Sequence, residues 1–527
     1  MAKGNRKQSG DGNNADGVSR DELDWESIDW AYHENVVRRL QERIVKATEE
    51  GNRDKMHDLR RLLTRSRSAK LLAVKRVTEN DGAKTPGVDK IVWTHRRSKE
   101  MAVTQLDPRG YRPLPLRRVY IPKSNRSMRP LSIPTMLDRA MQALYLLALD
   151  PIAETIADPN SYGFRKGRSC ADAIEQCFNL LRRGQERWIF EGDIKGCFDH
   201  ISHEWLLEHI PMERSILRKW LHCGFLDKNV FAATTEGTPQ GGIISPVLAN
   251  LTLDGLERRL REIFPRLGPG STNAKKASVN FVRYADDFVI TASSKELLET
   301  RVRPLVVEFL RERGLELSEE KTKITRLKDG FDFLGQNVRS FGNKTIIRPS
   351  KKSIASFLTK IKQVIKAYQQ ASAVDLVRKL NPMIKGWANY HRHACSKKTF
   401  SYVDNQIFRW LTSWSQRRHR NKGRCWIVDK YFAVHGTRRW CFFGDDKDQK
   451  GGTERVWLRH AARTPIIRHD KVHSSAHPYK LAWQEYWRCR QRRRHSCHAG
   501  EESDAAYQLA SGFLGASPRP IWGVTEA

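Results

Sequence analysis

Two adjacent aspartates, Asp286 and Asp287, interrupt a β-forming stretch and constrain the local fold more tightly than any other segment of the chain. The residues of Val279–Tyr284 precede the pair, and those of Phe288–Ala292 follow it. Two short β-rich runs separated by a polar turn predict a β-hairpin. Neighbouring carboxylates between apolar strands repel each other unless a cation or nearby donors neutralise them. We therefore expect a hairpin with two carboxylates at its turn, either as a divalent-metal site or as an ordinary solvated Asp-rich turn.

A third carboxylate favours the metal site over the solvated turn. The apolar run Trp188-Ile-Phe190 leads into Asp193, so this side chain also lies at the end of a predicted strand. Three carboxylates from two strand ends can hold two hard cations through oxygen ligands. Two such ions suit phosphoryl transfer, because one activates a hydroxyl nucleophile and the other stabilises the leaving group. Asp199, six residues further on, is expected to be a structural partner and not a ligand.

The charge balance points to a polyanionic partner. The 527 residues suffice for roughly three or four domains, and 94 Lys and Arg against 60 Asp and Glu give a net charge of +34. Nucleic acid is the natural counterpart of such a chain. No apolar run approaches the ~20 residues of a membrane span, and no secretion signal opens the sequence, so we expect no membrane partner. Nine scattered cysteines without a Cys-x-x-Cys pair indicate a reducing, cytoplasmic location, associated with the nucleoid when the protein acts on DNA.

Composition and periodicity divide the chain into parts. Residues 1–20 predict a flexible tail, and residues 25–77 predict two or three amphipathic helices that either form a solvated cap or grip nucleic acid. An α/β region follows to residue 348, with helices expected after Pro246 and from the N-cap Ser202. Beyond Ser350 an apolar stripe at helical spacing alternates with lysines, which predicts a helix with a positive outer face. The stripe comprises Ile354, Phe357, Ile361, Val364 or Ile365, and Tyr368, and the lysines are Lys351, Lys352, Lys360, Lys362 and Lys366.

The acidic segments resemble the catalytic motifs of the reverse transcriptase superfamily. Tyr284-Ala-Asp-Asp287 resembles its catalytic box, and Asp193 with Phe198 resembles its first acidic motif. Further motifs occur in the order seen in group II intron-encoded reverse transcriptases, over a span from about Trp25 to Phe432. These motifs are Thr85-Pro-Gly-Val-Asp89, Val119-Tyr-Ile-Pro-Lys123 with Met128-Arg-Pro-Leu131, Tyr162-Gly-Phe-Arg165, Gly237-Thr-Pro-Gln-Gly-Gly242 and Phe331-Asp-Phe-Leu-Gly335.

The resemblance implies an α+β multidomain fold shaped as a right-hand polymerase. Fingers and a palm with an antiparallel sheet would occupy residues 21–348, an α-helical thumb or maturase domain residues 349–435, and a basic DNA-binding-like segment residues 436–527. It also implies that Asp193, Asp286 and Asp287 are catalytic metal ligands for two ions, Mg²⁺ or Mn²⁺. Phe198 would then close over the deoxyribose and leave no room for a 2′-hydroxyl.

Nucleotide contacts follow from the same resemblance. Lys123 and Arg129 flank the polar turn 124–127, where a point charge and a guanidinium fork suit a triphosphate, although a solvent-exposed basic hairpin explains them as well. Gln240, among glycines that allow close backbone approach, would lie beside the incoming nucleotide. Lys321 would lie near the leaving pyrophosphate as a general acid, and the alternative is an ordinary exposed helix lysine.

The segment Leu380–Arg392 resembles the maturase domain of group II intron proteins, which implies RNA binding by Lys385, Trp387, Tyr390 and Arg392. The two aromatic residues fit a hydrophobic core equally well. A second basic cluster, Arg417-Arg-His-Arg-Asn-Lys422, is suited to gripping phosphates.

The C-terminal part departs from family members that carry a His-Asn-His endonuclease. The histidines and cysteines have the wrong spacing for that domain, so we expect a basic DNA-binding remnant without nuclease or metal site. These residues are His469, His473, His477, Cys489, His495, Cys497 and His498. Within the segment, His477-Pro-Tyr479 and Trp483-Gln-Glu-Tyr486 resemble the DNA-binding stretch that precedes the nuclease in relatives.

The sequence thus predicts an RNA-directed DNA polymerase that assists intron splicing and mobility by target-primed reverse transcription. Its expected partners are intron RNA, an RNA template, a DNA primer or target, and dNTPs, and its oligomeric state is left open. One alternative is a reverse transcriptase of a defence or diversity-generating lineage. Another is an RNA-binding splicing cofactor without polymerase activity.

Overall fold

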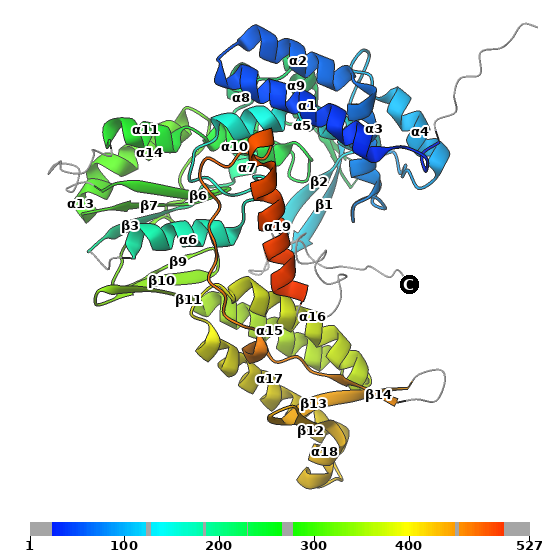
Figure 1. The fold of residues 1–527 in the computed structure, drawn as a ribbon, viewed down its shortest axis with the longest axis vertical. Helices are drawn as coiled ribbons and strands as arrows, with labels where there is room; N and C mark the ends of the chain where they lie inside the picture. Colours follow the sequence, from blue (N-terminus) through cyan, green and yellow to red (C-terminus); the bar gives the residue numbers. More distant parts are fainter. Residues whose placement is uncertain are drawn as a thin grey trace, which may run out of the picture.

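A computed structural model describes residues 24–499 except 123–127, 183–185, 229, 266–277 and 448–452. The body is elongated, with helices and two four-stranded sheets in its upper part and a helical domain below (Figure 1). The predicted tail at 1–20 and Lys123 lie outside the described residues. No helix within the described ranges is long and apolar enough to cross a membrane.

Three N-terminal helices form within residues 25–77, as the apolar periodicity predicts, and a fourth follows at residues 96–105. They are α1 (Trp30–Glu49), α2 (Arg53–Arg65), α3 (Arg67–Thr78) and α4 (Arg96–Gln105). Asp29 caps α1 by accepting from the Tyr32 backbone N–H, and Asn52 caps α2 in the same way. The apolar faces of α1, α2 and α3 pack on the long helix α5 (Met136–Ile156), so these helices belong to the core of the upper body.

The first sheet, here called the hairpin sheet, has the strand order β2-β1-β4-β5. Its strands are β1 (Leu116–Pro122), β2 (Met128–Ile133), β4 (Phe225–Asp227) and β5 (Val230–Ala232). Strands β1 and β2 are antiparallel and pair Ile121 with Arg129, so Arg129 lies on the second strand of the pair.

The second sheet, here called the core sheet, has the order β6-β7-β3-β8, and all its pairs are antiparallel. Its strands are β3 (Trp188–Gly192), β6 (Asn280–Tyr284), β7 (Asp287–Ala292) and β8 (Lys323–Arg326). Alternate residues point to opposite faces, so Val282 and Val289 pack in one hydrophobic cluster while Phe281 and Phe288 pack in another. Both faces are therefore buried, and polar chemistry is left to the sheet's edges and strand ends.

Helices cover the two faces of the core sheet (Figure 1). One cluster contains residues of α6 (Cys170–Leu181), and the other contains residues of α10 (Ser245–Leu253), α11 (Leu256–Ile263) and α14 (Arg303–Arg311). The short elements α7 (Cys197–His200), α8 (His203–His209), α9 (Arg214–Leu221), α13 (Lys295–Leu297) and the π-helix η1 (Leu298–Val302) connect them. The helices expected after Pro246 and from the N-cap Ser202 are confirmed, since Ser202 accepts from the Trp205 backbone N–H.

The lower part, here called the helical domain, has its own hydrophobic core. A small sheet of β9 (Phe331–Phe333), β10 (Gln336–Phe341) and β11 (Lys344–Pro349) precedes helices α15 (Lys351–Ala367), α16 (Ala373–His391), α17 (Lys397–Arg418) and α18 (Arg424–Tyr431). The predicted stripe is confirmed: Phe357, Ile361 and Ile365 are buried, while the five lysines of α15 are exposed. Strands β13 (Arg438–Lys447) and β14 (Thr453–Trp457) pack on α16, while β12 (Phe432–His435) packs on α18. The boundary predicted at residues 435 and 436 therefore falls inside a hairpin.

The remaining described chain, residues 458–499, runs back along the upper body and is here called the C-terminal strap. It contains the short helices η2 (Ala461–Arg463) and η3 (Leu481–Trp483) and the helix α19 (Gln484–Ala499), which runs lengthwise in front of the body (Figure 1). Tyr479 bonds to the half-buried Asp150 of α5, and Lys480 pairs with Glu49 of α1. The strap thus joins the helical domain to the core and the N-terminal helices.

Candidate active site

The predicted catalytic hairpin is present. Tyr284 pairs with Asp287 across β6 and β7, so Ala285 and Asp286 form a two-residue turn. Ala285 has φ +57°, in the left-handed region that residues other than glycine rarely adopt. Asp286 is half-buried and Asp287 is exposed at the end of its strand. The two carboxylates therefore stand at the edge of an otherwise buried sheet.

Asp193 lies on the strand next to this hairpin. Strand β3 pairs with β7 so that Gly192 opposes Phe288, which places Asp193 opposite Asp287 just beyond the paired residues. Opposed residues in antiparallel strands have Cα atoms about 4.5–5.5 Å apart. The structure thus brings Asp193, Asp286 and Asp287 to one edge, although 93 residues separate the first from the second in the sequence.

The edge concentrates negative charge. Desolvation at the sheet edge, followed by the charges of Asp286 and Asp193, raises the pKa of Asp287 to about 7 although its side chain reaches solvent. Desolvation also raises the pKa of Asp286, and the charge of Asp193 adds to the effect. A site that disfavours its own ionised carboxylates attracts a proton or a cation.

Lys321 supplies one positive charge at this edge. Its Nζ lies 2.9 Å from Asp193 Oδ1, and this hydrogen bond raises the pKa of the lysine. The residue lies in a turn, not in a helix as the alternative interpretation assumed. Asp193 is thus occupied by Lys321. The described residues contain no group of three or more His, Cys, Asp or Glu side chains arranged to hold a metal ion. The donor set nevertheless consists of the hard carboxylate oxygens that Mg²⁺ and Mn²⁺ prefer.

Two predicted nucleotide contacts, Arg129 and Gln240, lie in one hydrogen-bonded chain that ends on Asp199. Arg129 Nε donates to Gln240 Oε1 at 3.0 Å, and Gln240 Nε2 donates to Asp199 Oδ1 at 2.9 Å. Asp199 thus binds the amide of Gln240, and its expected role as a structural partner stays a prediction. The Thr238 backbone N–H donates to the carbonyl of Phe198. The Phe198 ring packs edge-on against the ring of Phe164, with 6.2 Å between the ring centroids. Hairpin sheet, glycine-rich loop and α7 are therefore held together beside the carboxylates.

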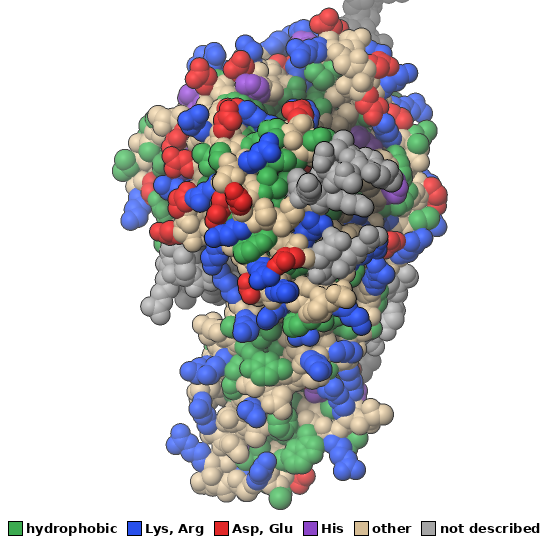
Figure 2. All heavy atoms as spheres, turned by 90° about the vertical axis from the view of Figure 1, so that its left-hand side faces the viewer, with side chains coloured by type: hydrophobic (Ala, Val, Ile, Leu, Met, Phe, Trp, Pro, Cys, Tyr) green, Lys and Arg blue, Asp and Glu red, His purple; other side chains and the backbone are tan. Residues whose placement is uncertain are grey.

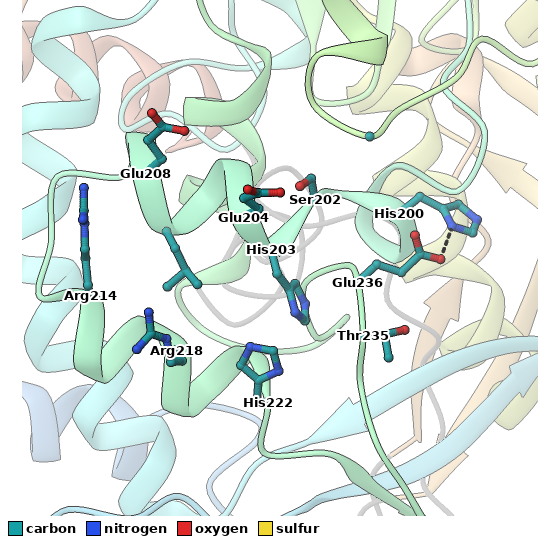
Figure 3. Close-up of a pocket in the computed structure, with 12 residues that line it drawn as sticks. His200, Ser202, His203, Glu204, Glu208, Arg214, Arg218, His222, Thr235 and Glu236 are labelled. Atoms are coloured by element: carbon teal, nitrogen blue, oxygen red, sulfur yellow. Dashed lines mark hydrogen bonds and ion pairs between the residues drawn. The ribbon is translucent and has the colours of Figure 1, made fainter.

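A cavity of about 790 Å³ lies behind this loop (Figure 3). His203 Nε2 bonds to the Gly237 carbonyl at 2.8 Å, so a residue that lines the cavity is linked to the first residue of the glycine-rich segment. Glutamates of α8 and arginines of α9 line it together, namely Glu204, Glu208, Arg214 and Arg218. This mixed lining selects neither an anionic nor a cationic ligand.

The predicted RNA-binding residues of α16 are engaged with the protein itself. Trp387 stacks on Phe357 at 4.6 Å with nearly parallel rings, and Tyr390 Oη donates to the Leu334 carbonyl at 2.7 Å. These contacts agree with the core alternative for both aromatic residues. Lys385 and Arg392 are half-buried. Contact of all four residues with RNA stays a prediction.

The C-terminal histidines have separate partners. His469 Nε2 lies 2.9 Å from Asp172, His477 Nε2 lies 3.1 Å from Thr155, and His473 bonds to Ser475. The side chains of His495, Cys497 and His498 lie outside the described set.

The sequence predicts no role for Arg283, Asn250 or Gly163, yet all three surround the catalytic turn. Arg283 bonds to Asn250 and to the Ala285 carbonyl, and Gly163 lies against the Ala285 backbone. Two signals were available: an arginine between Val282 and Tyr284, inside an apolar strand, and the place of Gly163 in the motif Tyr162-Gly-Phe-Arg165.

Three family models match the chain. The N-terminal domain of reverse transcriptase matches residues 25–106, reverse transcriptase (RNA-dependent DNA polymerase) matches residues 121–338, and the group II intron maturase-specific domain matches residues 354–432. These matches define the class as reverse transcriptase and confirm the predicted enzyme, an RNA-directed DNA polymerase.

Individual proteins are similar to parts of the chain. Protein YkfC of Escherichia coli is 36% identical over 294 residues, which cover 49% of this chain and 76% of that protein. The group II intron-encoded protein LtrA of Lactococcus lactis subsp. cremoris is 32% identical over 371 residues, 59% of this chain and 61% of that protein. Among solved structures, telomerase from Candida albicans has a TM-score of 0.34 at 13% identity and covers 60% of this chain and 61% of that chain. The chain belongs to the group II intron-encoded reverse transcriptases with a maturase domain, as the ordered motifs predict.

Proposed function

We propose that the chain copies RNA into DNA at the edge of the core sheet. In this proposal the core sheet is the palm, the hairpin sheet with the N-terminal helices forms the fingers, and the helical domain is the thumb. The observation that carries the proposal is the strand register that sets Asp193 opposite Asp287, beside the turn that bears Asp286.

Asp193, Asp286 and Asp287 would hold two divalent cations, Mg²⁺ or Mn²⁺. When bound, the ions would activate the primer 3′-hydroxyl and stabilise the pyrophosphate leaving group. The crowded negative charge at the edge supports this assignment, because ionised carboxylates in this arrangement call for neutralisation. Lys321 would leave Asp193 and turn its ammonium toward the departing pyrophosphate, where it can donate a proton.

Residues of the hairpin sheet, of α7 and of the glycine-rich segment Gly237–Gly242 would orient the incoming dNTP. Arg129 and Lys123 would bind the triphosphate, and Gln240, already held by Arg129 and Asp199, would contact the nucleotide. Phe198 is fixed through its carbonyl by Thr238 and would reject a 2′-hydroxyl by its bulk.

The helical domain would bind intron RNA and so assist splicing. Figure 2 shows basic side chains spread over this part of the molecule, whereas acidic ones gather on the upper body. The exposed lysines of α15 supply positive charge over a rigid helix. Such a surface binds phosphates largely without reading sequence. Mobility of the intron by target-primed reverse transcription would add a DNA target, with exposed arginines of the C-terminal strap as its contacts.

The substitution Asp286→Asn tests the polymerase site. It removes one carboxylate charge with almost no change in shape, so primer extension on an RNA template should fall below detection while intron RNA binding is retained. Asp329→Asn is the matched control, because Asp329 is an exposed aspartate in another turn of the same body. Normal extension by Asp286→Asn would refute the metal assignment. Retained splicing in that variant would separate the maturase role from the polymerase role.

A further inference from the structure

Arg283 is a fully buried cation two residues before the catalytic turn. It lies on β6 between Val282 and Tyr284, and 1% of its side chain is exposed. A guanidinium is expensive to bury unless charges and acceptors surround it. Its retention inside an apolar strand therefore calls for specific partners.

Those partners connect the turn to two other segments. One terminal nitrogen of Arg283 pairs with the carboxylate of Asp254, at the end of α10. The other, Nη1, donates to Asn250 Oδ1 at 3.1 Å and to the backbone carbonyl of Ala285 at 3.2 Å. The first contact stays within the supporting helices, while the contact with Ala285 reaches the turn itself.

The turn needs external support because of its backbone. Ala285 adopts φ +57° without being glycine, a conformation that is disfavoured for any residue with a Cβ. Gly163 lies so close that a Cβ there would be 2.2 Å from the Ala285 nitrogen. Asn250 Nδ2 donates to the Gly163 carbonyl at 2.8 Å. Arg283 and Asn250 thus hold both sides of the contact between Gly163 and Ala285.

The carbonyl that Arg283 binds belongs to the peptide joining Ala285 to Asp286. The orientation of this peptide determines the direction in which the Asp286 side chain leaves the backbone. We propose that Arg283 is a positioning residue for the polymerase reaction: its guanidinium holds the Ala285–Asp286 peptide and so aims the Asp286 carboxylate at the metal position. This inference rests on the proposed function, in which Asp286 is a metal ligand.

A purely structural role would make a different prediction. If Arg283 only neutralised Asp254, a lysine would serve nearly as well, since one ammonium can pair with one carboxylate. A lysine cannot reproduce the planar fork that serves Asp254, Asn250 and Ala285 together. Arg283→Lys therefore keeps the buried pair and removes the hold on the turn.

The experiment compares Arg283→Lys with Arg60→Lys. Arg60 is also buried, on α2, and donates to the Pro211 carbonyl outside the site. Thermal unfolding, intron RNA binding and single-nucleotide extension are measured, the last over a Mg²⁺ titration. For Arg283→Lys we expect RNA binding as in the wild type, extension slowed on the order of 100-fold, and a several-fold higher Mg²⁺ concentration at half-maximal rate. Arg60→Lys should leave the Mg²⁺ dependence unchanged.

A second variant covers the case in which Arg283→Lys does not fold. Asn250→Ala leaves the pair between Arg283 and Asp254 in place but removes the amide that links Arg283 to Gly163, and it should raise the Mg²⁺ requirement in the same direction. Ala285→Gly relieves the disfavoured φ and should partly rescue Arg283→Lys.

Two outcomes overturn the proposal. One is an unchanged Mg²⁺ dependence in a folded Arg283→Lys variant, and the other is an unchanged dependence in Asn250→Ala when Arg283→Lys is unfolded. If Asp286→Asn is inactive in the same assay, only the positioning role fails. Should Asp286→Asn extend normally, the proposed function fails, and the positioning role fails with it.

Discussion

Gly163 lies directly behind the turn of the catalytic hairpin, and a single methyl group at this position should displace the turn. A Cβ on Gly163 would lie 2.2 Å from the backbone nitrogen of Ala285 and 2.9 Å from its Cα. Ordinary contact begins near 3.4 Å, so the two segments must separate by about 1 Å. Because both close neighbours are backbone atoms, no side-chain rotation relieves the overlap in Gly163→Ala.

The expected magnitudes separate catalysis from folding. Overpacking of this kind costs about 1–3 kcal/mol, whereas folded domains are stable by about 5–15 kcal/mol. Most of the variant therefore remains folded at 25 °C. A displacement of about 1 Å at reacting groups lowers a rate on the order of 100-fold. The loss of rate should thus be far larger than the fraction of unfolded protein explains.

Gly444→Ala is the matched control. A Cβ on Gly444 would also lie 2.2 Å from a backbone nitrogen, that of Val374, but in the helical domain. Incorporation of one nucleotide is followed under single-turnover conditions with saturating primer–template and dNTP, and urea unfolding gives the stability of each variant. Both variants should lose similar stability, and only Gly163→Ala should lose about 100-fold in rate. Wild-type extension by Gly163→Ala, at a stability matching that of the control, would refute the reasoning.

Two further perturbations probe the parts around the site. Asp172 is fully buried and accepts from His469 at 2.9 Å and from Arg490 at 2.6 Å. Asp172→Asn leaves Arg490 without its counter-charge, which costs about 3–5 kcal/mol of stability, and a protease should then cut the C-terminal strap faster. Cleavage as slow as in the wild type would contradict this. Burial lowers the pKa of His391 to about 3, so the folded residue stays neutral while the unfolded one gains a proton below its ordinary pKa of 6.5. Stability should therefore fall with pH from about 6.5 toward the folded pKa, by up to about 1.4 kcal/mol per pH unit from this group. His391→Gln should reduce the slope between pH 6.5 and 4 by up to one proton in urea unfolding, and an identical slope would show that the residue does not titrate in this way.

The catalytic edge is predictable because its signals are local. The hairpin from Tyr284 to Asp287 follows from apolar runs on both sides of a polar turn, and the N-cap of α8 follows from the side chain of Ser202. The order of the motifs along the chain predicts the family, although each motif alone is weak. The register that brings Asp193 opposite Asp287 is tertiary, and only the resemblance supplied it in advance.

The supporting residues are not predictable in this way. In a chain of net charge +34, one more arginine indicates surface, and nothing local marks Arg283 as the partner of Asp254, 29 residues earlier. The same limit applies to Tyr390. Its spacing along the helix fits either a hydrophobic core or a ring on which RNA bases stack. Its packing is set by the hydrogen bond to the Leu334 carbonyl, which joins residues 56 positions apart.

The C-terminal strap shows how tertiary contacts change the meaning of a basic sequence. Its density of arginine and histidine indicates a nucleic-acid contact, yet His469 and Arg490 are directed at the buried Asp172, about 300 residues earlier in the chain. Both side chains bind a carboxylate inside the protein and therefore contribute little to an external partner. Arg488 and Arg493, by contrast, are largely exposed and pair with the exposed carboxylates of Glu485 and Asp470, and such surface pairs are weak. DNA binding by the strap, as we propose it, would therefore use the solvent-facing side of α19, whereas the half-buried Tyr486 and Trp487 pack that helix against the catalytic body.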